Sequence, residues 1–263
     1  MENRRTKTYF VADIHLGASY IADPVAHERR FVRFLETIAA DAARIYLLGD
    51  ILDYHFEYKN AIPAHCLRTL GLLGQLSDRG IEIVWIAGNH DTWFRGTLAR
   101  ELRITTTTQT VIDTVIDNQR FILTHGDAVG PVSRKYRVLR AILRNPVARF
   151  LYAAIHPRWT TSLALGCSRL SRRSQGGPVI TPWMGDKNEP IYQYALSLAS
   201  EPSAAPNYII TGHRHLAVDR LIPGSNTRLV ILGEGYKNIN YAVFDGKKLS
   251  VHDFVDENNL ASK

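Results

Sequence analysis

Five short polar clusters in the sequence carry the kinds of side chain that bind metal ions, and each follows an apolar run typical of a buried strand. The clusters are FVADIHLG with Asp13 and His15, IYLLGDILD with Asp50 and Asp53, WIAGNHD with Asn89, His90 and Asp91, ILTHGD with His125 and Asp127, and IITGHRH with His213 and His215. Their carboxylate, imidazole and amide groups suit Mn²⁺, Fe²⁺ or Zn²⁺, and no thiolate is among them. Because strand ends in an open α/β sheet converge on one crevice, we expect the clusters to form one metal site.

Each cluster alone has a simpler interpretation. An Asp-x-His sequence after a strand is more often a turn, GNHD could be a turn in which Asn and Asp bond their own backbone, and GHRH could be two surface histidines. Five such clusters in the same context are not explained in that way. Gly49, Gly88 and Gly212 accompany them, and glycine lets the backbone turn sharply and approach an ion closely. The sequence therefore favours a joint metal site.

The elements that would position these clusters alternate between strands and helices in the first half of the chain. The predicted strands are 8–12, 44–48 and 81–87, and the predicted helices are 24–43 and 63–79. This alternation predicts βαβ units and a mainly parallel sheet. In the second half, hairpins are predicted at 117–118 and 245–246. We therefore expect a mixed sheet flanked by helices, with antiparallel pairing in the second half.

The net charge of +7 is concentrated in one segment of this ordinary globular composition. Residues 130–180 contain ten Lys or Arg and no Asp or Glu, whereas the rest of the chain has 22 basic and 25 acidic residues. The segment from about 128 to 190 is mostly helical in pattern, with arginines on one face and apolar residues on another. We expect one domain over residues 1–263 with this basic helical insertion, which should meet an anionic ligand or surface.

Cysteine usage and hydropathy predict a cytoplasmic protein. Cys66 and Cys167 lie far apart and form no disulfide or zinc motif. The amino-terminal residues lack an apolar signal core, and no run of about 18 apolar residues could span a bilayer.

The ordered set D-x-H, G-D-x-x-D, G-N-H-D, H-G-D and G-H-x-H resembles the calcineurin-like metallophosphoesterases. The resemblance implies an α/β fold in which a mixed β-sheet sandwich is flanked by helices, here with an inserted helical cap. It also implies two divalent metal ions, with Mn²⁺ favoured over Fe²⁺ or Zn²⁺. One ion would be held by Asp13, His15, Asp50 and His215; Asp50 would bridge to the second, which Asn89, His125 and His213 complete.

Two such ions about 3.5–4 Å apart can trap a water, lower its pKa to give hydroxide near neutral pH, and neutralise phosphoryl oxygens during in-line displacement. His90, beside Asn89, is placed to donate a proton, or only charge, to the phosphoryl group or leaving oxygen. Asp53 and Asp127 are expected to orient ligand imidazoles. Asp91 either does the same or fixes the turn that holds His90.

The stretches DIHLGASY, IYLLGDILDYHFEYK, GNHDTWF and NPVARFLYAAIHPRWT resemble the UDP-2,3-diacylglucosamine diphosphatases of lipid A synthesis. This implies attack of the metal-bound hydroxide on the α-phosphate, giving UMP and 2,3-diacylglucosamine 1-phosphate, by a cytoplasmic protein peripherally associated with the inner membrane. Some members carry Arg where this chain has His90, and LGEGYKNINYAVFDG departs mildly from the branch. Arg134, Lys135, Arg137 and Arg140 are the cap residues expected to contact this UDP-linked acylated sugar, and the cap could touch an anionic membrane surface.

Two other functions remain open from the sequence. A broad-specificity metallophosphodiesterase or nuclease would use the basic segment for backbone contacts, although no evident aromatic stacking surface is present and a nucleic-acid partner is not expected. A non-catalytic, metal-stabilised membrane-binding scaffold would keep the fold without turnover. A scaffold has no need of the complete ligand set plus His90, and the oligomeric state is not indicated.

Overall fold

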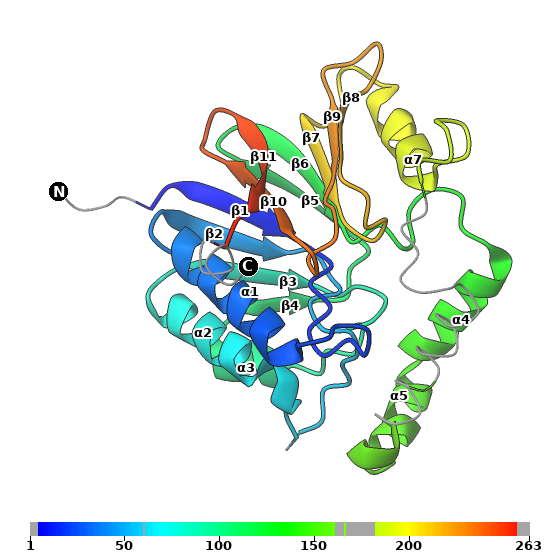
Figure 1. The fold of residues 1–263 in the computed structure, drawn as a ribbon. Coiled ribbons are helices and arrows are strands. Elements are labelled where there is room, and N and C mark those ends of the chain that lie inside the picture. Colours follow the sequence, from blue (N-terminus) through cyan, green and yellow to red (C-terminus); the bar gives the residue numbers. More distant parts are fainter. Residues whose placement is uncertain (1–4, 60, 161–165, 167–181, 257–263) are drawn as a thin grey trace.

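Two β-sheets lie face to face in the computed structural model, with helices on their outer sides (Figure 1). The structure describes residues 5–59, 61–160, 166 and 182–256. The strands are β1 (Lys7–Val11), β2 (Ala42–Leu47), β3 (Glu82–Ile86), β4 (Thr105–Thr107), β5 (Val111–Ile116), β6 (Gln119–Thr124), β7 (Tyr208–Thr211), β8 (Val218–Leu221), β9 (Arg228–Ile231), β10 (Ile239–Phe244) and β11 (Leu249–Phe254). The helices are α1 (Pro24–Ile38), the 3₁₀ turn η1 (Ala64–Cys66), α2 (Leu67–Asp78), α3 (Thr97–Leu102), α4 (Arg134–Arg144), α5 (Pro146–Ala153) and α7 (Pro190–Ala199).

The first sheet has the strand order β11-β10-β1-β2-β3-β4. Strands β1 to β4 are parallel, as predicted, and Val11 pairs with Leu47, which in turn pairs with Trp85. This register places the residues that follow β1, β2 and β3 side by side at the carboxyl ends of the strands, because parallel strands end together there. Three of the five polar clusters therefore begin side by side.

The second sheet has the order β5-β6-β7-β9-β8. The hairpin predicted at Asp117 and Asn118 joins β5 to β6, and both turn residues have positive φ values. The expectation of antiparallel pairing is wrong for β6, β7 and β9, which are parallel to one another. Thr124 at the end of β6 pairs with Thr211 at the end of β7, so the fourth and fifth clusters also start together.

Three apolar layers hold this arrangement. Between the sheets, Phe10 of the first sheet and Leu48, which directly follows β2, pack with Phe121 and Val230 of the second sheet. On the outer side of the first sheet, α1 and α2 cover the strands with residues such as Phe31. The helix α7 covers the outer side of the second sheet. The order is helix, sheet, sheet, helix, and it supports the α/β sandwich expected from the sequence.

Two predicted helix boundaries are wrong. The helix expected at 24–43 ends at Ile38, because β2 begins at Ala42 to pair with β1. The helix expected at 63–79 begins with a 3₁₀ turn, and α2 itself starts at Leu67. At that start the buried Glu28 of α1 accepts hydrogen bonds from two α2 backbone N–H groups.

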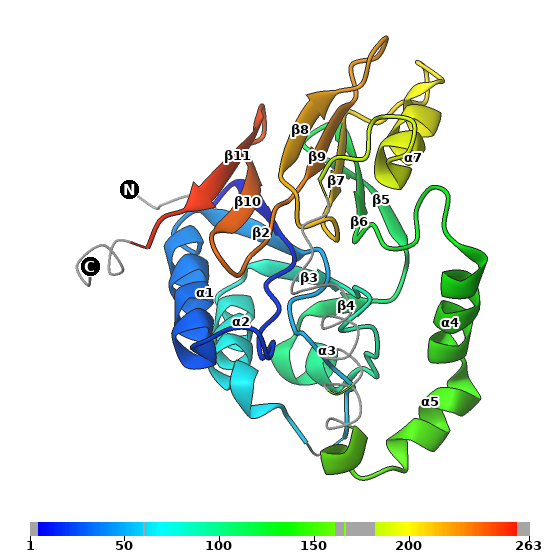
Figure 2. The same cartoon turned by 45° about the vertical axis from the view of Figure 1, so that its right-hand side comes forward.

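The predicted basic insertion leaves the second sheet after β6 and returns at α7. Its described part includes α4 and α5, which form an arm running away from α7 along the edge of the first sheet (Figures 1 and 2). The Trp93 indole donates to the Leu143 carbonyl, and the hydroxyls of Tyr54 and Tyr152 lie 2.9 Å apart, so the arm contacts the loops that follow β2 and β3. Part of the predicted insertion, residues 161–165 and 167–181 with Cys167, lies outside the described residues. Among the described helices, none combines the length and apolar character needed to cross a membrane.

Candidate metal centre

The ligand candidates occupy unusual backbone positions directly after their strands. Asp13, His15, Asp50, His213 and His215 all have φ values between +52° and +70°. Residues other than glycine rarely adopt this left-handed backbone region, and those that do so cluster at functional sites. The sequence pattern predicted the strand ends but not this conformation.

Two of the predicted glycines allow carboxylates to lie directly on the backbone. A Cβ added to Gly88 would lie 2.1 Å from Asp50 Oδ1, and one added to Gly212 would lie 2.3 Å from Asp13 Oδ2. Any side chain at these positions would displace a ligand candidate. Glycine is required here for close approach, whether or not it also eases the turn.

The first group of candidate ligands joins the ends of β1 and β7. Asp13 Oδ1 lies 3.8 Å from His15 Nε2 and 3.5 Å from His215 Nε2, and the two imidazole nitrogens are 3.2 Å apart. Asp50 Oδ2 is 3.8 Å from His15 Nε2. These donor atoms converge on one point, and those of Asp13, His15 and Asp50 are buried.

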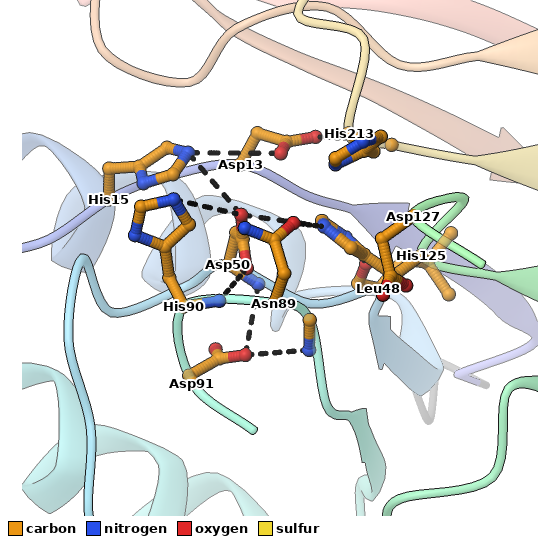
Figure 3. A network of polar contacts seen from close by, with 12 residues as sticks. Asp13, His15, Leu48, Asp50, Asn89, His90, Asp91, His125, Asp127 and His213 are labelled. Carbon is orange, nitrogen blue, oxygen red and sulfur yellow. Dashed lines mark hydrogen bonds and ion pairs between the residues drawn. The ribbon is translucent and has the colours of Figure 1, made fainter. Parts of the chain in front are cut away.

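The second group joins the ends of β2, β3 and β6. Asp50 Oδ2 lies 3.4 Å from His125 Nε2, and Asn89 Oδ1 lies 3.1 Å from the same nitrogen. The His213 ring centroid is 5.1 Å from that of His125, and the two rings are steeply inclined. Figure 3 shows Asp50 between the two groups, with the rings of His15 and His90 on one side and His125 on the other. One Asp50 carboxylate therefore adjoins both groups.

Hydrogen bonds behind the rings orient two of the candidate ligands. His125 Nδ1 lies 2.9 Å from the Leu48 carbonyl oxygen, so it donates its proton there and leaves Nε2 free to face the cluster. His15 Nδ1 lies 3.1 Å from Asp53 Oδ1, the orienting contact expected of Asp53. A carbonyl or carboxylate behind a ligand imidazole is the usual partner in metal sites.

The chemistry of the donor set fits divalent cations. Asp13 Oδ1 is buried and has no hydrogen-bond partner among the described residues. Three overlapping groups bring their ligand atoms within 4.8 Å of one another: Asp13, His15 and His215; Asp13, Asp50 and His125; and His15, Asp53 and His90. An orphaned buried oxygen among converging nitrogens is costly unless a cation satisfies it.

The electrostatics of the cluster also favour the binding of divalent cations. Burial, together with His125, lowers the pKa of His213 to about 4, and burial with His15 lowers that of His215 to about 3, so both are neutral at pH 7, as ligands must be. Burial alone would lower the pKa of His125, but Asp50 and Asp13 outweigh it and raise that pKa well above its usual range. The cluster therefore attracts positive charge, which a metal ion can supply in place of protons.

Asp91 holds the turn that carries Asn89 and His90. Its fully buried carboxylate accepts from the backbone N–H groups of Gly88, Asp50 and Ile51 and from the Trp85 indole, at 2.7–3.1 Å. These contacts support the second of its two expected roles, because the carboxylate bonds backbone groups instead of a ligand ring.

His90 stands at the rim of the cluster. Its side chain is 28% exposed, Nε2 lies 4.0 Å from Asp50 Oδ2, and Nδ1 lies 2.7 Å from the Asp53 carbonyl oxygen. The carbonyl can only accept, so Nδ1 carries a proton and Nε2 is the nitrogen that faces the cluster.

Asp127 makes different contacts from those expected. Its carboxylate accepts from the Tyr136 hydroxyl at 2.6 Å and lies 3.4 Å from Arg140 Nε, and no described hydrogen bond or ion pair joins it to an imidazole. Tyr136 and Arg140 belong to α4, so Asp127 fastens the insertion to the end of β6.

The predicted cap residues divide into two sets. Arg134, Lys135 and Arg137 are exposed on α4, whereas Arg140 is half-buried against the core. Arg144 was not among the predicted site residues, although it lies one helical turn after Arg140 on the same face of α4. It lines a cavity of about 140 Å³ together with Asn89 and Arg140. Its Nε is buried without a hydrogen-bond partner among the described residues, and burial together with Arg140 lowers its pKa.

Comparison of the sequence with known proteins finds one matching family. The model of the calcineurin-like phosphoesterase family matches residues 6–217. A protein of Porphyromonas gingivalis named UDP-2,3-diacylglucosamine hydrolase is 39% identical over 261 residues, which cover 96% of this chain and 99% of the relative. Proteins with the same name from Edwardsiella ictaluri (31% identical, 66% of this chain and 65% of the relative) and Ralstonia nicotianae (27% identical, 79% and 76%) are also similar.

Proposed function

This chain belongs to the calcineurin-like phosphoesterase family, and we propose that it hydrolyses the diphosphate of UDP-2,3-diacylglucosamine to UMP and 2,3-diacylglucosamine 1-phosphate, a step of lipid A synthesis. The observation that carries the substrate assignment is the similarity to the Porphyromonas protein, which extends over 96% of this chain and nearly all of the relative. The similarity therefore includes the insertion as well as the metal-binding core. We treat residues 1–263 as one domain with a cap at about 128–190.

Seven residues would hold two divalent ions. Asp13, His15 and His215 would bind one, Asn89, His125 and His213 the other, and Asp50, which adjoins both groups, would bind both. We propose Mn²⁺, with Fe²⁺ or Zn²⁺ as alternatives, because the donors are oxygen and imidazole nitrogen without thiolate. When bound, such a pair supplies an activated water and neutralises phosphoryl charge.

His90 has one defined way to assist. Because Nδ1–H is committed to the Asp53 carbonyl, His90 can donate from Nε2 only when both nitrogens are protonated. His90 therefore needs both ring nitrogens protonated for either role, whether it donates a proton to the leaving oxygen or only places a positive charge beside it. Replacing His90 with Gln removes the charge but keeps a donor, so it separates these roles from simple hydrogen bonding.

The insertion would bind the rest of the substrate. Arg140 and Arg144 line the cavity that contains Asn89, and two guanidinium groups suit a diphosphate. Farther along the arm, Phe150 and Trp159 are about 70% exposed, and at the opposite end, in the first turn of α4, Arg134, Lys135 and Arg137 are exposed. We propose that these groups meet the acyl chains and an anionic membrane surface, which would place the protein in the cytoplasm at the inner membrane.

The test is release of UMP from UDP-2,3-diacylglucosamine by protein loaded with Mn²⁺, with metal content measured by elemental analysis. We expect turnover that stops on chelation and returns with Mn²⁺. Asp50→Ala should lose at least about 10³-fold in turnover, because both ions lose a ligand. Protein that cleaves a generic aryl phosphodiester well but releases no UMP would refute the substrate assignment.

A further inference from the structure

The loop that carries His213 and His215 contains a third polar residue between them. Gly212 to His215 follow β7, and the backbone N–H of Arg214 bonds the Gly212 carbonyl at 2.9 Å, which closes a three-residue turn around His213. His213 has φ +70° and His215 has φ +53°. Two left-handed positions separated by a single residue persist only where surrounding contacts hold them.

The Arg214 side chain is one of those contacts. Its Nε lies 2.6 Å from Glu189 Oε1 and its Nη2 lies 3.0 Å from Glu189 Oε2, a bidentate ion pair. The Glu189 side chain is completely buried and that of Arg214 is 14% exposed. A planar guanidinium bonded at two points fixes direction as well as distance, which a single point charge does not.

Glu189 belongs to the returning end of the insertion. It precedes Pro190, the first residue of α7, and a Cβ added to Gly130 at the departing end would lie 2.1 Å from the Pro190 carbonyl oxygen. The two ends of the insertion therefore meet beside the metal centre. Glu189 reaches the ligand loop from this junction.

A separate set of contacts holds the same segment from its other side. Asp186 accepts from the Trp183 indole and pairs with Arg220, whose guanidinium also lies over the Trp183 ring. These contacts do not involve the loop after β7. Glu189 is thus supported independently of Arg214, so the ion pair can position the loop rather than merely follow it.

We propose that Glu189 is a positioning residue for the metal centre, acting through Arg214 to fix His213 and His215, one candidate ligand of each ion. The base of the insertion then sets the geometry of both metal sites. The inference rests on the dimetal centre of the proposed function, but not on the identity of its substrate.

The test measures metal binding without substrate. Glu189→Gln keeps the shape and one acceptor but removes the charge, and we expect Mn²⁺ dissociation constants raised by about tenfold or more, as for other groups that orient ligands. The electron paramagnetic resonance spectrum of the Mn²⁺-loaded variant should show less exchange-coupled metal pair and more isolated ion. The matched control, Asp219→Asn, removes the charge from another bidentate pair, that of Asp219 with Arg228 in the second sheet, and should leave Mn²⁺ affinity within about twofold of wild type.

A purely structural ion pair would lower stability without changing metal affinity. If Glu189→Gln does not fold, the double variant Glu189→Met with Arg214→Met removes both charges at similar volume, which cores tolerate better than one unpaired charge. It should fold and still bind Mn²⁺ about tenfold more weakly. Wild-type Mn²⁺ affinity and coupling in either folded variant would overturn the inference. Wild-type protein that binds no divalent ion would overturn the dimetal centre with it, whereas failure of the UMP assay alone would leave these measurements valid.

Discussion

Replacing Asp91 by Asn tests whether one buried carboxylate holds the two turns that carry Asp50 and Asn89. The carboxylate of Asp91 accepts from Gly88 and Asp50 N–H at Oδ1, and from Ile51 N–H and the Trp85 indole at Oδ2. Asparagine has the same shape but only one acceptor oxygen. Whichever way the amide lies, its NH₂ group faces one of the two donor pairs.

The magnitude follows from that count. Two buried N–H groups lose their acceptor, and each such loss costs about 1–3 kcal/mol. Burial and the neighbouring Asp50 raise the pKa of Asp91, so the buried charge is itself unfavourable and its removal returns part of the cost. We expect the free energy of unfolding to fall by about 2–4 kcal/mol, given the hydrogen-bond range above.

The assay is urea unfolding of the metal-free protein at pH 7, followed by Mn²⁺ titration of the folded variant. Asp78→Asn is the matched control, because the Asp78 side chain is 63% exposed and its pair with Arg103 is at the surface; we expect a change within about 0.5 kcal/mol. Asp91→Asn should also weaken Mn²⁺ binding, since the turns it joins carry ligands of both groups. A loss of stability below about 1 kcal/mol with unchanged metal affinity would refute the argument.

Three further outcomes are expected. Glu28→Ala should lower the free energy of unfolding by about 1–2 kcal/mol, because Glu28 Oε1 accepts from two backbone N–H groups at the start of α2 and alanine offers no acceptor; equal urea midpoints would contradict this. Burial lowers the pKa of His27 to about 4 in the folded protein. Between pH 6.5 and 4, His27 therefore stays neutral in the folded protein but gains a proton in the unfolded chain. The free energy of unfolding should fall over this range as the pH is lowered. His27→Gln should flatten that part of the stability profile of the metal-free protein, and an unchanged slope would exclude the assignment. Tyr152→Phe removes the hydroxyl that bonds Tyr54, so amide exchange in α5 should accelerate while exchange in β1 to β3 stays constant; identical exchange in α5 would show that this bond does not fasten the arm.

Much of the first sheet was predictable because its strands are continuous apolar runs that stop at polar clusters. The runs before Asp13, Asp50 and Asn89 became β1, β2 and β3, and their parallel register brought the clusters together. The end of α1 was not predictable from local sequence. Residues 39–43 are mostly alanine, the best helix former, and the helix stops because Ala42 pairs with β1 instead.

The contacts that orient the ligands were harder to predict from the sequence than the ligands themselves. A ligand is recognised by its type and its place after a strand, whereas its partner can come from any distance along the chain. Asp53 was found because it lies near its strand end, but Glu189 and Arg144 lie in a helical insertion whose contacts only the fold reveals. For Asp127 the local sequence was misleading. Its place in the HGD motif suggested an imidazole partner, whereas its carboxylate accepts a hydrogen bond from the Tyr136 hydroxyl.

The left-handed backbone of five ligand candidates explains why these hidden contacts matter for function. A residue held in that region gives up free energy that neighbouring bonds must supply. Around this centre part of that free energy comes from two buried carboxylates that are not ligand candidates, Asp91 under one pair of turns and Glu189 under another. Changes at these carboxylates should therefore alter metal affinity, whereas changes at the exposed cations of α4, such as Arg137, should alter substrate affinity and leave metal binding intact. Variants of the two sets can therefore be told apart by a metal titration performed without substrate.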